Sequence, residues 1–284
     1  MIIFEKEKYQ DLIPTLKKAD INTLFAMSVL EGKVDGKVFV DNSEAPTSFY
    51  IHHPYGMALL YGENGEENFY KELKPYLLNS KNTRNKMEWL QVYPSALYQK
   101  MEALLEDHLL KKDPDEAYSH PSLAEAGKVL EYRRINFIFH KDKYASIRKN
   151  LSDNDIEIAS ITEDIYNQLT GSVIPSYFWN SFQDFSTQGA GYTVVLNNSI
   201  PASTAFASSI IDIKLEIGIE TNPDYRGSGF ATRACARLID YCLENGLEPV
   251  WSCHSGNMGS RKLAMKLGFE ECKRIPYYCL PCSL

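Results

Sequence analysis

The chain has 284 residues, of which 44% are hydrophobic and 24% are charged, and its formal net charge is −7. This length suffices for two domains, and the composition is that of a globular protein. The acidic balance argues against a nucleic-acid-binding surface, and no apolar run approaches the length of a membrane-spanning helix. The N-terminal residues carry charges where a signal peptide needs its apolar stretch. We therefore expect a cytoplasmic protein that has neither nucleic acid nor a membrane as its partner.

The first half of the chain shows a series of short strand patterns and one helical segment. The expected elements are a β-hairpin at 37–48, strands at 57–61 and 86–93, a helix at 95–110 and a strand at 132–137. After the strand at 57–61 come two acids, Glu66 and Glu67, which suit the first turn of a helix and would repel a phosphate group. His52 and His53 have no metal-binding partner near them in the sequence, so we expect both on a strand surface.

The second half repeats this order of elements. It contains a hairpin at 192–203, strands at 215–220 and 249–253, a helix at 257–267 and a strand at 272–277. The repetition predicts a diverged duplication, with one domain at 1–150 and the other at 151–284. We expect the boundary in the polar stretch 150–155, after an irregular connection from about 111 to 130.

One segment of the second half has the features of an anion-binding site. The alternating strand pattern of Leu215–Glu220 is followed by Tyr225-Arg226-Gly227-Ser228-Gly229, and apolar residues then recur at helical spacing from 230 to 245. A strand, a glycine turn and a helix N-terminus together point backbone N–H groups at an anion. Arg226 adds a guanidinium that suits phosphate. The segment therefore predicts a pyrophosphate site.

Two common phosphate motifs do not fit this segment. Thr232 stands where the dinucleotide fingerprint needs its third glycine, and no Gly-Lys-Ser/Thr ending occurs in the chain. Arg226, Gly229 and Ala231 instead form Arg-x-x-Gly-x-Ala, which resembles the acyl-coenzyme A signature of the Gcn5-related N-acetyltransferases (GNAT). The resemblance continues through 248–254, Asn257 and a helix that ends in Lys-Leu-Gly-Phe at 266–269. This variant resembles a subgroup that includes antibiotic self-resistance (zwittermicin-type) acetyltransferases.

The resemblance implies an α/β fold with mixed sheets, the GNAT acyl-CoA N-acyltransferase fold, in two tandem GNAT-like halves. The first half would be degenerate, and the second would bind acetyl-CoA as co-substrate. Backbone groups of Ile219 and Thr221 would bond the pantetheine arm, and Asn257 and Ser260 would contact the cofactor. The pyrophosphate would be held by backbone N–H groups and one hydroxyl, namely those of Arg226, Gly227, Ser228, Gly229, Phe230, Ala231 and Thr232.

The activity implied is transfer of an acetyl group to a primary amine of a small molecule, by direct attack and without a covalent enzyme intermediate. Glu216 matches a frequent acidic position of the family, and Glu220 leaves the same strand face, so both are candidate bases. The alternative is that both are solvated residues on an exposed strand. His254, expected close to the thioester, is the histidine that we single out.

The proton donor is the point at which the chain departs from the family pattern. Ala264 stands where many members carry a tyrosine, so a tyrosine in that role is absent. The candidates that could replace it are Tyr277, Tyr278, Cys253 and Ser255. In the earlier aromatic stretch, Trp179 and Phe182 either floor the acceptor pocket or belong to the core.

Two other classes of function stay open on the sequence. One is a catalytically silent acyl-CoA-binding or regulatory protein, which the absent tyrosine and the degenerate first half would suit. The other is a metal or redox module, since all six cysteines lie in the last 50 residues and Cys279-Leu-Pro-Cys282 has the spacing of a metal half-site. We expect no metal, and the sequence leaves a homodimer open.

Overall fold

The computed structural model describes residues 1–62, 65–119, 127–151, 156–197 and 200–282. The chain divides into two units, each described here by itself. Unit 1 comprises Met1–Ile135, Cys253–Met258 and Lys273–Leu284, and unit 2 comprises Asn136–Ser252 and Gly259–Cys272. These units do not coincide with 1–150 and 151–284, because residues 136–150 belong to unit 2 and the C-terminal residues to unit 1. Residues 152–155, in the stretch where we expected the boundary, lie outside the described residues.

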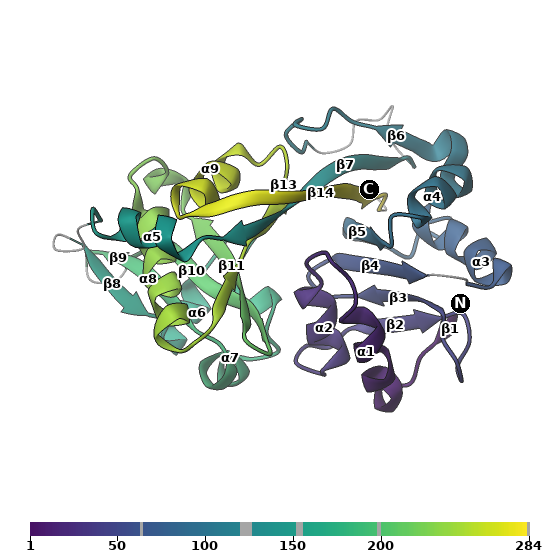
Figure 1. Ribbon diagram of the computed structural model, residues 1–284, viewed down its shortest axis with the longest axis horizontal. Coiled ribbons are helices and arrows are strands. Elements are labelled where there is room, and N and C mark those ends of the chain that lie inside the picture. Colours follow the sequence, from purple (N-terminus) through teal and green to yellow (C-terminus); the bar gives the residue numbers. More distant parts are fainter. Residues whose placement is uncertain (63–64, 120–126, 152–155, 198–199, 283–284) are drawn as a thin grey trace. The chain divides into compact units, whose positions relative to one another are not determined.

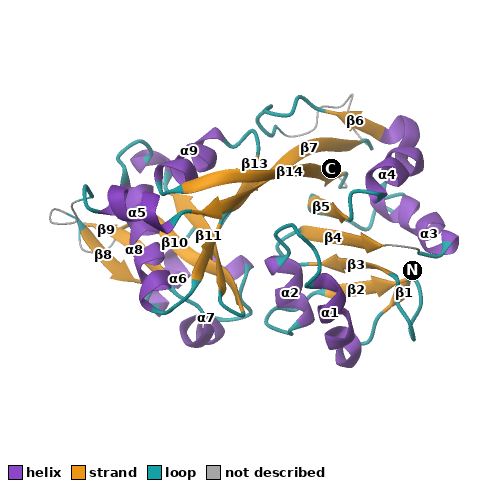
Figure 2. Ribbon diagram, viewed as in Figure 1, coloured by secondary structure: helices purple, strands orange, loops and turns teal. Residues whose placement is uncertain are grey.

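Unit 1 is built on a mixed β-sheet (Figure 1, Figure 2). Its strands follow the order β1 (Ile2–Ile3), β2 (Lys37–Val40), β3 (Ser48–His52), β4 (Met57–Gly62), β5 (Glu88–Tyr93), β14 (Phe269–Leu280), β7 (Val129–Phe139) and β13 (Ser252–His254), with β6 (Leu109–Lys111) beside β7. Strands β1 to β4 pair antiparallel, whereas β4 and β5 pair parallel. A parallel pair needs a crossover connection, which helix α3 (Glu67–Leu77) supplies. Strands β7, β13 and β14 also contribute residues to unit 2.

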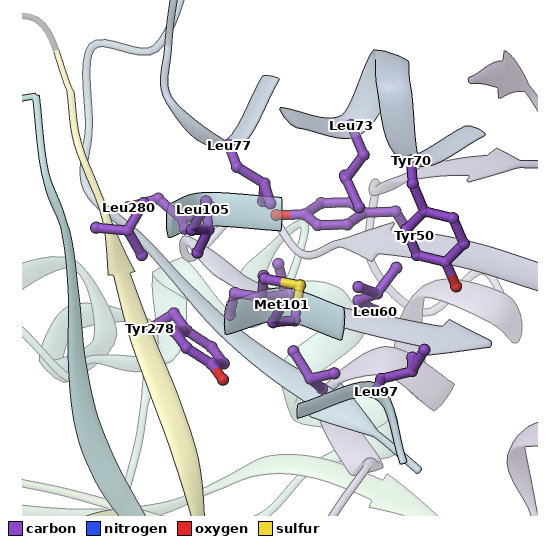
Figure 3. Packing of buried hydrophobic residues seen from close by; sticks show 14 of the residues in the cluster. Tyr50, Leu60, Tyr70, Leu73, Leu77, Leu97, Met101, Leu105, Tyr278 and Leu280 are labelled. Carbon is purple, nitrogen blue, oxygen red and sulfur yellow. The ribbon is translucent and has the colours of Figure 1, made fainter. Parts of the chain in front are cut away.

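The main core of unit 1 lies between the sheet and helices α3 and α4 (Leu97–Leu105). Figure 3 shows Leu73 and Leu77 of α3 and Met101 of α4 packed with strand residues, among them Tyr278 and Leu280 of the last strand. Two shorter helices, α1 (Ile13–Leu16) and α2 (Leu24–Leu30), precede the sheet in the chain, and α2 contacts β3 and β4.

Two expectations for unit 1 are wrong. The helix expected at 95–110 ends at Leu105, and β6 begins at Leu109. His53 is 1% exposed and does not lie on a strand surface. Its Nδ1 accepts the N–H of Tyr55 at 3.1 Å, and its ring meets the edge of Phe25. A turn at the end of β3 folds this side chain inward, which the strand pattern alone did not indicate.

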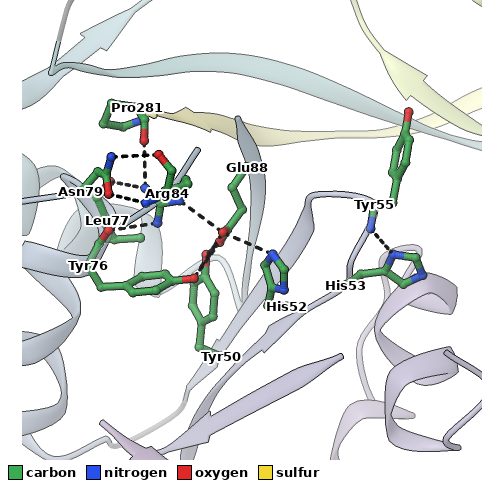
Figure 4. A network of polar contacts seen from close by, with 10 residues as sticks. All are labelled: Tyr50, His52, His53, Tyr55, Tyr76, Leu77, Asn79, Arg84, Glu88 and Pro281. Atoms are coloured by element: carbon green, nitrogen blue, oxygen red, sulfur yellow. Dashed lines mark hydrogen bonds and ion pairs between the residues drawn. The ribbon is translucent and has the colours of Figure 1, made fainter. Parts of the chain in front are cut away.

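A buried polar network ties the end of the chain into unit 1 (Figure 4). The Glu88 carboxylate accepts hydrogen bonds from the hydroxyls of Tyr50 and Tyr76, and it is paired with Arg84 Nε at 3.3 Å. Arg84 Nη1 also donates to the carbonyl of Pro281 at 3.0 Å. The guanidinium therefore joins β5 to the residue that follows β14.

Unit 2 contains a five-stranded mixed sheet with the same sequence of pairings. Its order is β12 (Glu248–Val250), β11 (Lys214–Thr221), β10 (Ile200–Ile211), β9 (Gly191–Leu196) and β8 (Glu157–Ser160). Pairing is antiparallel from β8 to β11, and the parallel step from β11 to β12 is made through α8 (Phe230–Glu244). The other helices of unit 2 are α5 (Lys141–Arg148), α6 (Glu163–Gln168), α7 (Phe182–Gln188) and α9 (Met258–Lys266).

Helix α8 is the central helix of unit 2, in contact with β9, β10, β11 and β12. Its apolar stripe is fully buried at Cys235, Leu238 and Cys242, as the helical spacing predicted. Burial raises the pKa of the Cys242 thiol to about 12 and that of Cys235 further, so both are inert core residues. Arg148 of α5 forms an ion pair at 2.8 Å with Asp240 of α8 and so joins the two helices.

Candidate active site

The glycine turn (Arg226–Gly229) ends in a backbone conformation that only glycine adopts readily. Gly227 has φ +84° and Gly229, the N-cap of α8, has φ +78°. No side chain caps this helix, and the first N–H groups of a helix have no partner within it. Those N–H groups and the helix dipole suit an anion, and the pyrophosphate site that the sequence led us to expect here stays a prediction. Residues Arg226 to Ser228 are exposed, whereas the Thr232 side chain is buried.

Two arginines stand at the glycine turn. Arg226, with its side chain 65% exposed, has Nε 3.4 Å from the Thr221 carbonyl and Nη2 4.0 Å from Glu220. The second is Arg233, whose Nη1 lies 3.4 Å from the position that a Cβ of Gly229 would take. The spacing of four residues between Gly229 and Arg233 could have shown that this arginine reaches back over the turn.

The strand before the turn has an open edge. Strands β11 and β12 pair only from Lys214–Glu248 to Glu216–Val250, after which the chain leaves β12 for β13. Among the described strands, none pairs with Ile217–Thr221 on that side, and we call this segment the open edge of β11. Because Asn222 N–H donates to Ala202, the alternation of an antiparallel pair turns the backbone groups of Ile219 and Thr221 away from β10. Both groups of Ile219 and the N–H of Thr221 are therefore available to an extended ligand, whereas the Thr221 carbonyl accepts Arg226 Nε.

Glu216 lies at the start of the open edge and is not solvated. It is 7% exposed, and its Oε1 accepts the hydroxyl of Ser252 at 2.9 Å. The hydroxyl of Ser208 donates to its main-chain carbonyl at 3.1 Å. A buried carboxylate at the end of strand pairing can accept a proton from a group bound beside it. The sequence did not indicate the two serines, although polar residues inside a strand of apolar character were a signal.

Glu220 has different surroundings. Its Oε2 accepts the N–H groups of Ser172 and Val173 at 2.8 and 2.9 Å, and the Ser172 hydroxyl at 3.1 Å. Gly171 has φ +136°, and a Cβ there would overlap the Glu220 side chain. Glu220 therefore fastens the loop at 171–173 to β11. Its Oε2 is already occupied by three donors of this loop.

Comparison with known proteins agrees with this geometry. The family model of the GNAT acetyltransferases matches residues 15–278. The chain belongs to the GNAT acetyltransferase family. It is 26% identical over 276 residues to the uncharacterized N-acetyltransferase YdfB of Bacillus subtilis (strain 168), and the match covers 96% of each chain. The protein is therefore an acyltransferase of the GNAT N-acetyltransferase type.

Two solved structures share the fold. A GCN5-related N-acetyltransferase-like protein from Streptococcus suis 89/1591 superposes with a TM-score of 0.68 at 21% identity, over 97% of this chain and all of that chain. A tandem GNAT protein from the clavulanic acid biosynthesis pathway, without AcCoA, superposes with a TM-score of 0.55 at 12% identity, over 100% and 98%. The expected mixed α/β GNAT fold is confirmed, with two mixed sheets.

The segment from Glu216 to the N-terminus of α8 lies within unit 2, and several other predicted residues are not part of that unit. Ser260 belongs to it, and its Oγ accepts the Trp251 indole N–H at 3.1 Å. Asn257 belongs to unit 1, as do His254 and Tyr277. The structure therefore does not bring these three residues together with Glu216 in one unit.

Within unit 1, His254 and Tyr277 are packing residues of an aromatic cluster. Trp89 stacks on Tyr277 at 4.8 Å and meets the edge of His254 at 5.7 Å. His254 Nδ1 accepts the N–H of Gly256, and burial lowers the pKa of the ring to about 4. An imidazole held neutral in this way packs well among aromatic rings.

The other candidates for proton donor also belong to unit 1. Tyr278 and Ser255 are fully buried, and Cys253 is 6% exposed. The Ser255 hydroxyl already donates to the Arg133 carbonyl at 2.9 Å, and burial raises the pKa of Tyr278 well above its usual range. In unit 2, Ala264 is buried and carries no proton to donate.

The aromatic stretch before α7 is mainly core. Trp179 is 4% exposed and donates its indole N–H to the Ala207 carbonyl at 2.8 Å, whereas Phe182 is partly exposed. Elsewhere, within the part of the chain that the structure describes, no group of three His, Cys, Asp or Glu side chains could hold a metal ion. No helix in the described ranges combines the length and apolar character needed to cross a membrane.

Proposed function

We propose that this GNAT protein transfers an acetyl group from acetyl-CoA to a primary amine of a small molecule. One observation carries the proposal: within unit 2, the open edge of β11 leads from the buried Glu216 to the glycine turn at the N-terminus of α8. An elongated donor with a pyrophosphate at one end and a thioester at the other suits this arrangement.

Different residues of the chain would bind the pyrophosphate, hold the pantetheine arm and accept the proton of the acceptor. The N–H groups of the glycine turn and the first turn of α8, with Arg226 and Arg233, would bind the pyrophosphate. Backbone groups of Ile219 and Thr221 would hold the pantetheine arm like an added strand. Glu216 would accept a proton from the ammonium group of the acceptor, which frees the amine to attack the thioester directly. A thiolate is a good leaving group, so the absence of a tyrosine at Ala264 is compatible with turnover.

The alternative of a catalytically silent acyl-CoA-binding protein is not favoured, since the family model and the curated relative are both acetyltransferases. The acyl donor, the small-amine acceptor, the self-resistance subgroup, a homodimer and a cytoplasmic location stay predictions.

Calorimetric titration of acetyl-CoA tests the cofactor site. We expect the wild-type protein to bind with micromolar affinity and Arg226→Ala/Arg233→Ala to lose at least about tenfold, since each charged phosphate contact contributes about 1.5–3 kcal/mol. Arg237→Ala is the matched control, because this arginine lies on the same helix and stacks over Tyr192 instead. Absence of binding to the wild type, or equal affinity for both proteins, would contradict the proposal.

A screen of primary amines, followed by release of free coenzyme A, tests the reaction. With an amine that is acetylated, Glu216→Gln should lower kcat by about 10²–10⁴ while leaving coenzyme A affinity unchanged, because the substitution removes the base and keeps the shape. Glu220→Gln should change kcat much less. A larger loss in Glu220→Gln than in Glu216→Gln would reverse the two assignments.

A further inference from the structure

Two serines of unit 2 lie beside Glu216. Glu216 is on β11, Ser209 on β10 is its register partner, and Ser252 at the start of β13 donates to its carboxylate. Partners directly opposite in an antiparallel pair share one sheet face, with Cβ atoms about 4.5–5.5 Å apart. The Ser209 hydroxyl and the Glu216 carboxylate are therefore neighbours on that face.

A β-bulge in β10 places Ser209 opposite Glu216. The register runs from Ala207 opposite Ile217 to Ser209 opposite Glu216, which leaves Ser208 as the extra residue. Two hydrogen bonds hold the bulge. The Trp179 indole N–H donates to the Ala207 carbonyl, and the Ser208 hydroxyl donates to the Glu216 carbonyl. Without the bulge, residue 208 would stand opposite Glu216.

The Ser209 hydroxyl is a buried polar group that still needs a partner. The residue is 3% exposed, and within the described ranges its Oγ has no hydrogen-bond partner. Buried hydroxyls in native proteins are nearly always hydrogen-bonded, and where no protein atom serves, an ordered water does. A water bound to Ser209 could also donate a hydrogen bond to the neighbouring Glu216 carboxylate, which as a charged group is a strong acceptor.

We propose that Ser209 is a positioning residue whose hydroxyl, together with the Glu216 carboxylate, binds one water through which the acceptor's proton reaches Glu216. This rests on the proposed function. The ammonium group gives one proton to the water, the water gives one to the carboxylate, and the water ends unchanged. The neutral amine is then free to attack.

A crystal structure of the coenzyme A complex, at a resolution that shows ordered water, tests the site without any acceptor. The expected result is a water within hydrogen-bond distance of both Ser209 Oγ and Glu216, which is lost in Ser209→Ala. A Ser209 hydroxyl that bonds a protein atom, with no such water, would overturn the proposal.

Kinetics with an amine found in the screen test the role of the water. Ser209→Ala should lower kcat about tenfold, leave the KM for acetyl-CoA unchanged and alter the solvent isotope effect, since the proton path is changed. In a Glu216→Gln background the same substitution should have no further effect. Thr193→Val, which removes a buried hydroxyl on β9 that bonds the Ser203 carbonyl and the Thr204 hydroxyl, should leave the isotope effect as in the wild type.

The two proposals fail in different ways. If no amine is acetylated, the proposed function fails, and the crystallographic water still decides whether Ser209 and Glu216 form a water site. If amines are acetylated but Ser209→Ala behaves like Thr193→Val, or is additive with Glu216→Gln, the positioning role is wrong and the acetyltransferase stands.

Discussion

Glu216 and Glu220 lie four residues apart on one strand, and they differ in the groups that surround their carboxylates. Glu216 is flanked by serine hydroxyls at the start of the open edge of β11, whereas Glu220 accepts two backbone N–H groups from the loop at 171–173. Their spacing in the sequence could place both side chains on one face of the strand, but it could not show that their surroundings differ. The contacts that do so come from residues 36 and 48 positions away in the chain.

A buried histidine should make unit 1 sensitive to acid. Burial lowers the pKa of His53 to about 3, from the 6.5 expected in an unfolded chain. Because the folded pKa is the lower one, the unfolded state takes up the proton first, so stability falls as pH drops from about 6.5 towards 3. The urea midpoint of the wild type should therefore decrease between pH 7 and pH 5. His53→Asn, whose Oδ1 can still accept the Tyr55 N–H, should show a smaller decrease.

The matched control for this measurement is His140→Asn, because His140 is partly exposed and pairs with Glu270 at 3.3 Å. This variant should keep most of the wild-type dependence on pH. His254, whose pKa burial lowers to about 4, contributes in the same direction and leaves a residual slope in His53→Asn. Identical slopes for the wild type and His53→Asn would show that His53 is not held neutral by the fold.

At the scale of elements, the two units differ in how far their parallel strands stay paired. In unit 1, β4 and β5 remain in register from Met57–Trp89 to Tyr61–Tyr93, whereas β11 and β12 separate after Glu216–Val250. The full pairing leaves β4 no open edge toward β5. The helix that follows begins with Glu66 and Glu67 in place of a glycine turn with arginine. Within the described residues of unit 1, neither the open strand edge nor the arginine-bearing glycine turn of the candidate donor site occurs.

Acetyl-CoA should accordingly bind once per chain. Calorimetry of the wild type should give a stoichiometry close to one, and Arg226→Ala/Arg233→Ala should weaken that binding event without revealing a second. Equilibrium dialysis with labelled acetyl-CoA gives an independent count. Two sites in the wild type, or one site that both substitutions leave intact, would place a donor site outside the glycine turn.

The elements that the sequence could predict are those fixed by neighbouring residues. The run from β11 through the glycine turn to α8 follows from strand alternation, two glycines and a helical stripe, all within about thirty residues. The hairpin of β2 and β3 and the strands β4 and β5 were likewise expected where they occur. The bulge that brings Ser209 beside Glu216 depends on distant contacts, and the pattern did not predict it. The assignment of the last strand could not be predicted either, because strand pairing between distant segments leaves no local signal.

At the scale of the whole molecule, the C-terminal strand makes unit 1 dependent on the end of the chain. Strand β14 pairs with β5 from Tyr277–Gln91 to Leu280–Glu88, and Tyr278 and Leu280 are fully buried in the core of unit 1. Arg84 adds a hydrogen bond to Pro281. Residues 1–135 alone would expose an edge of β5 and lose part of their core. Unit 1 therefore needs β14 to complete its sheet and its core.

Leu280→Ala should destabilise the chain by about 2–5 kcal/mol, because it removes fully buried methyl groups from this core. Cys282→Ala, a change in the same tail at a partly exposed residue, should stay within about 0.5 kcal/mol of the wild type. Hydrogen exchange read by mass spectrometry separates the units. In Leu280→Ala, peptides from β5 should lose protection before those from β10. Equal loss in both strands would mean that the units unfold together, and unchanged protection in β5 would mean that its pairing with β14 does not stabilise unit 1.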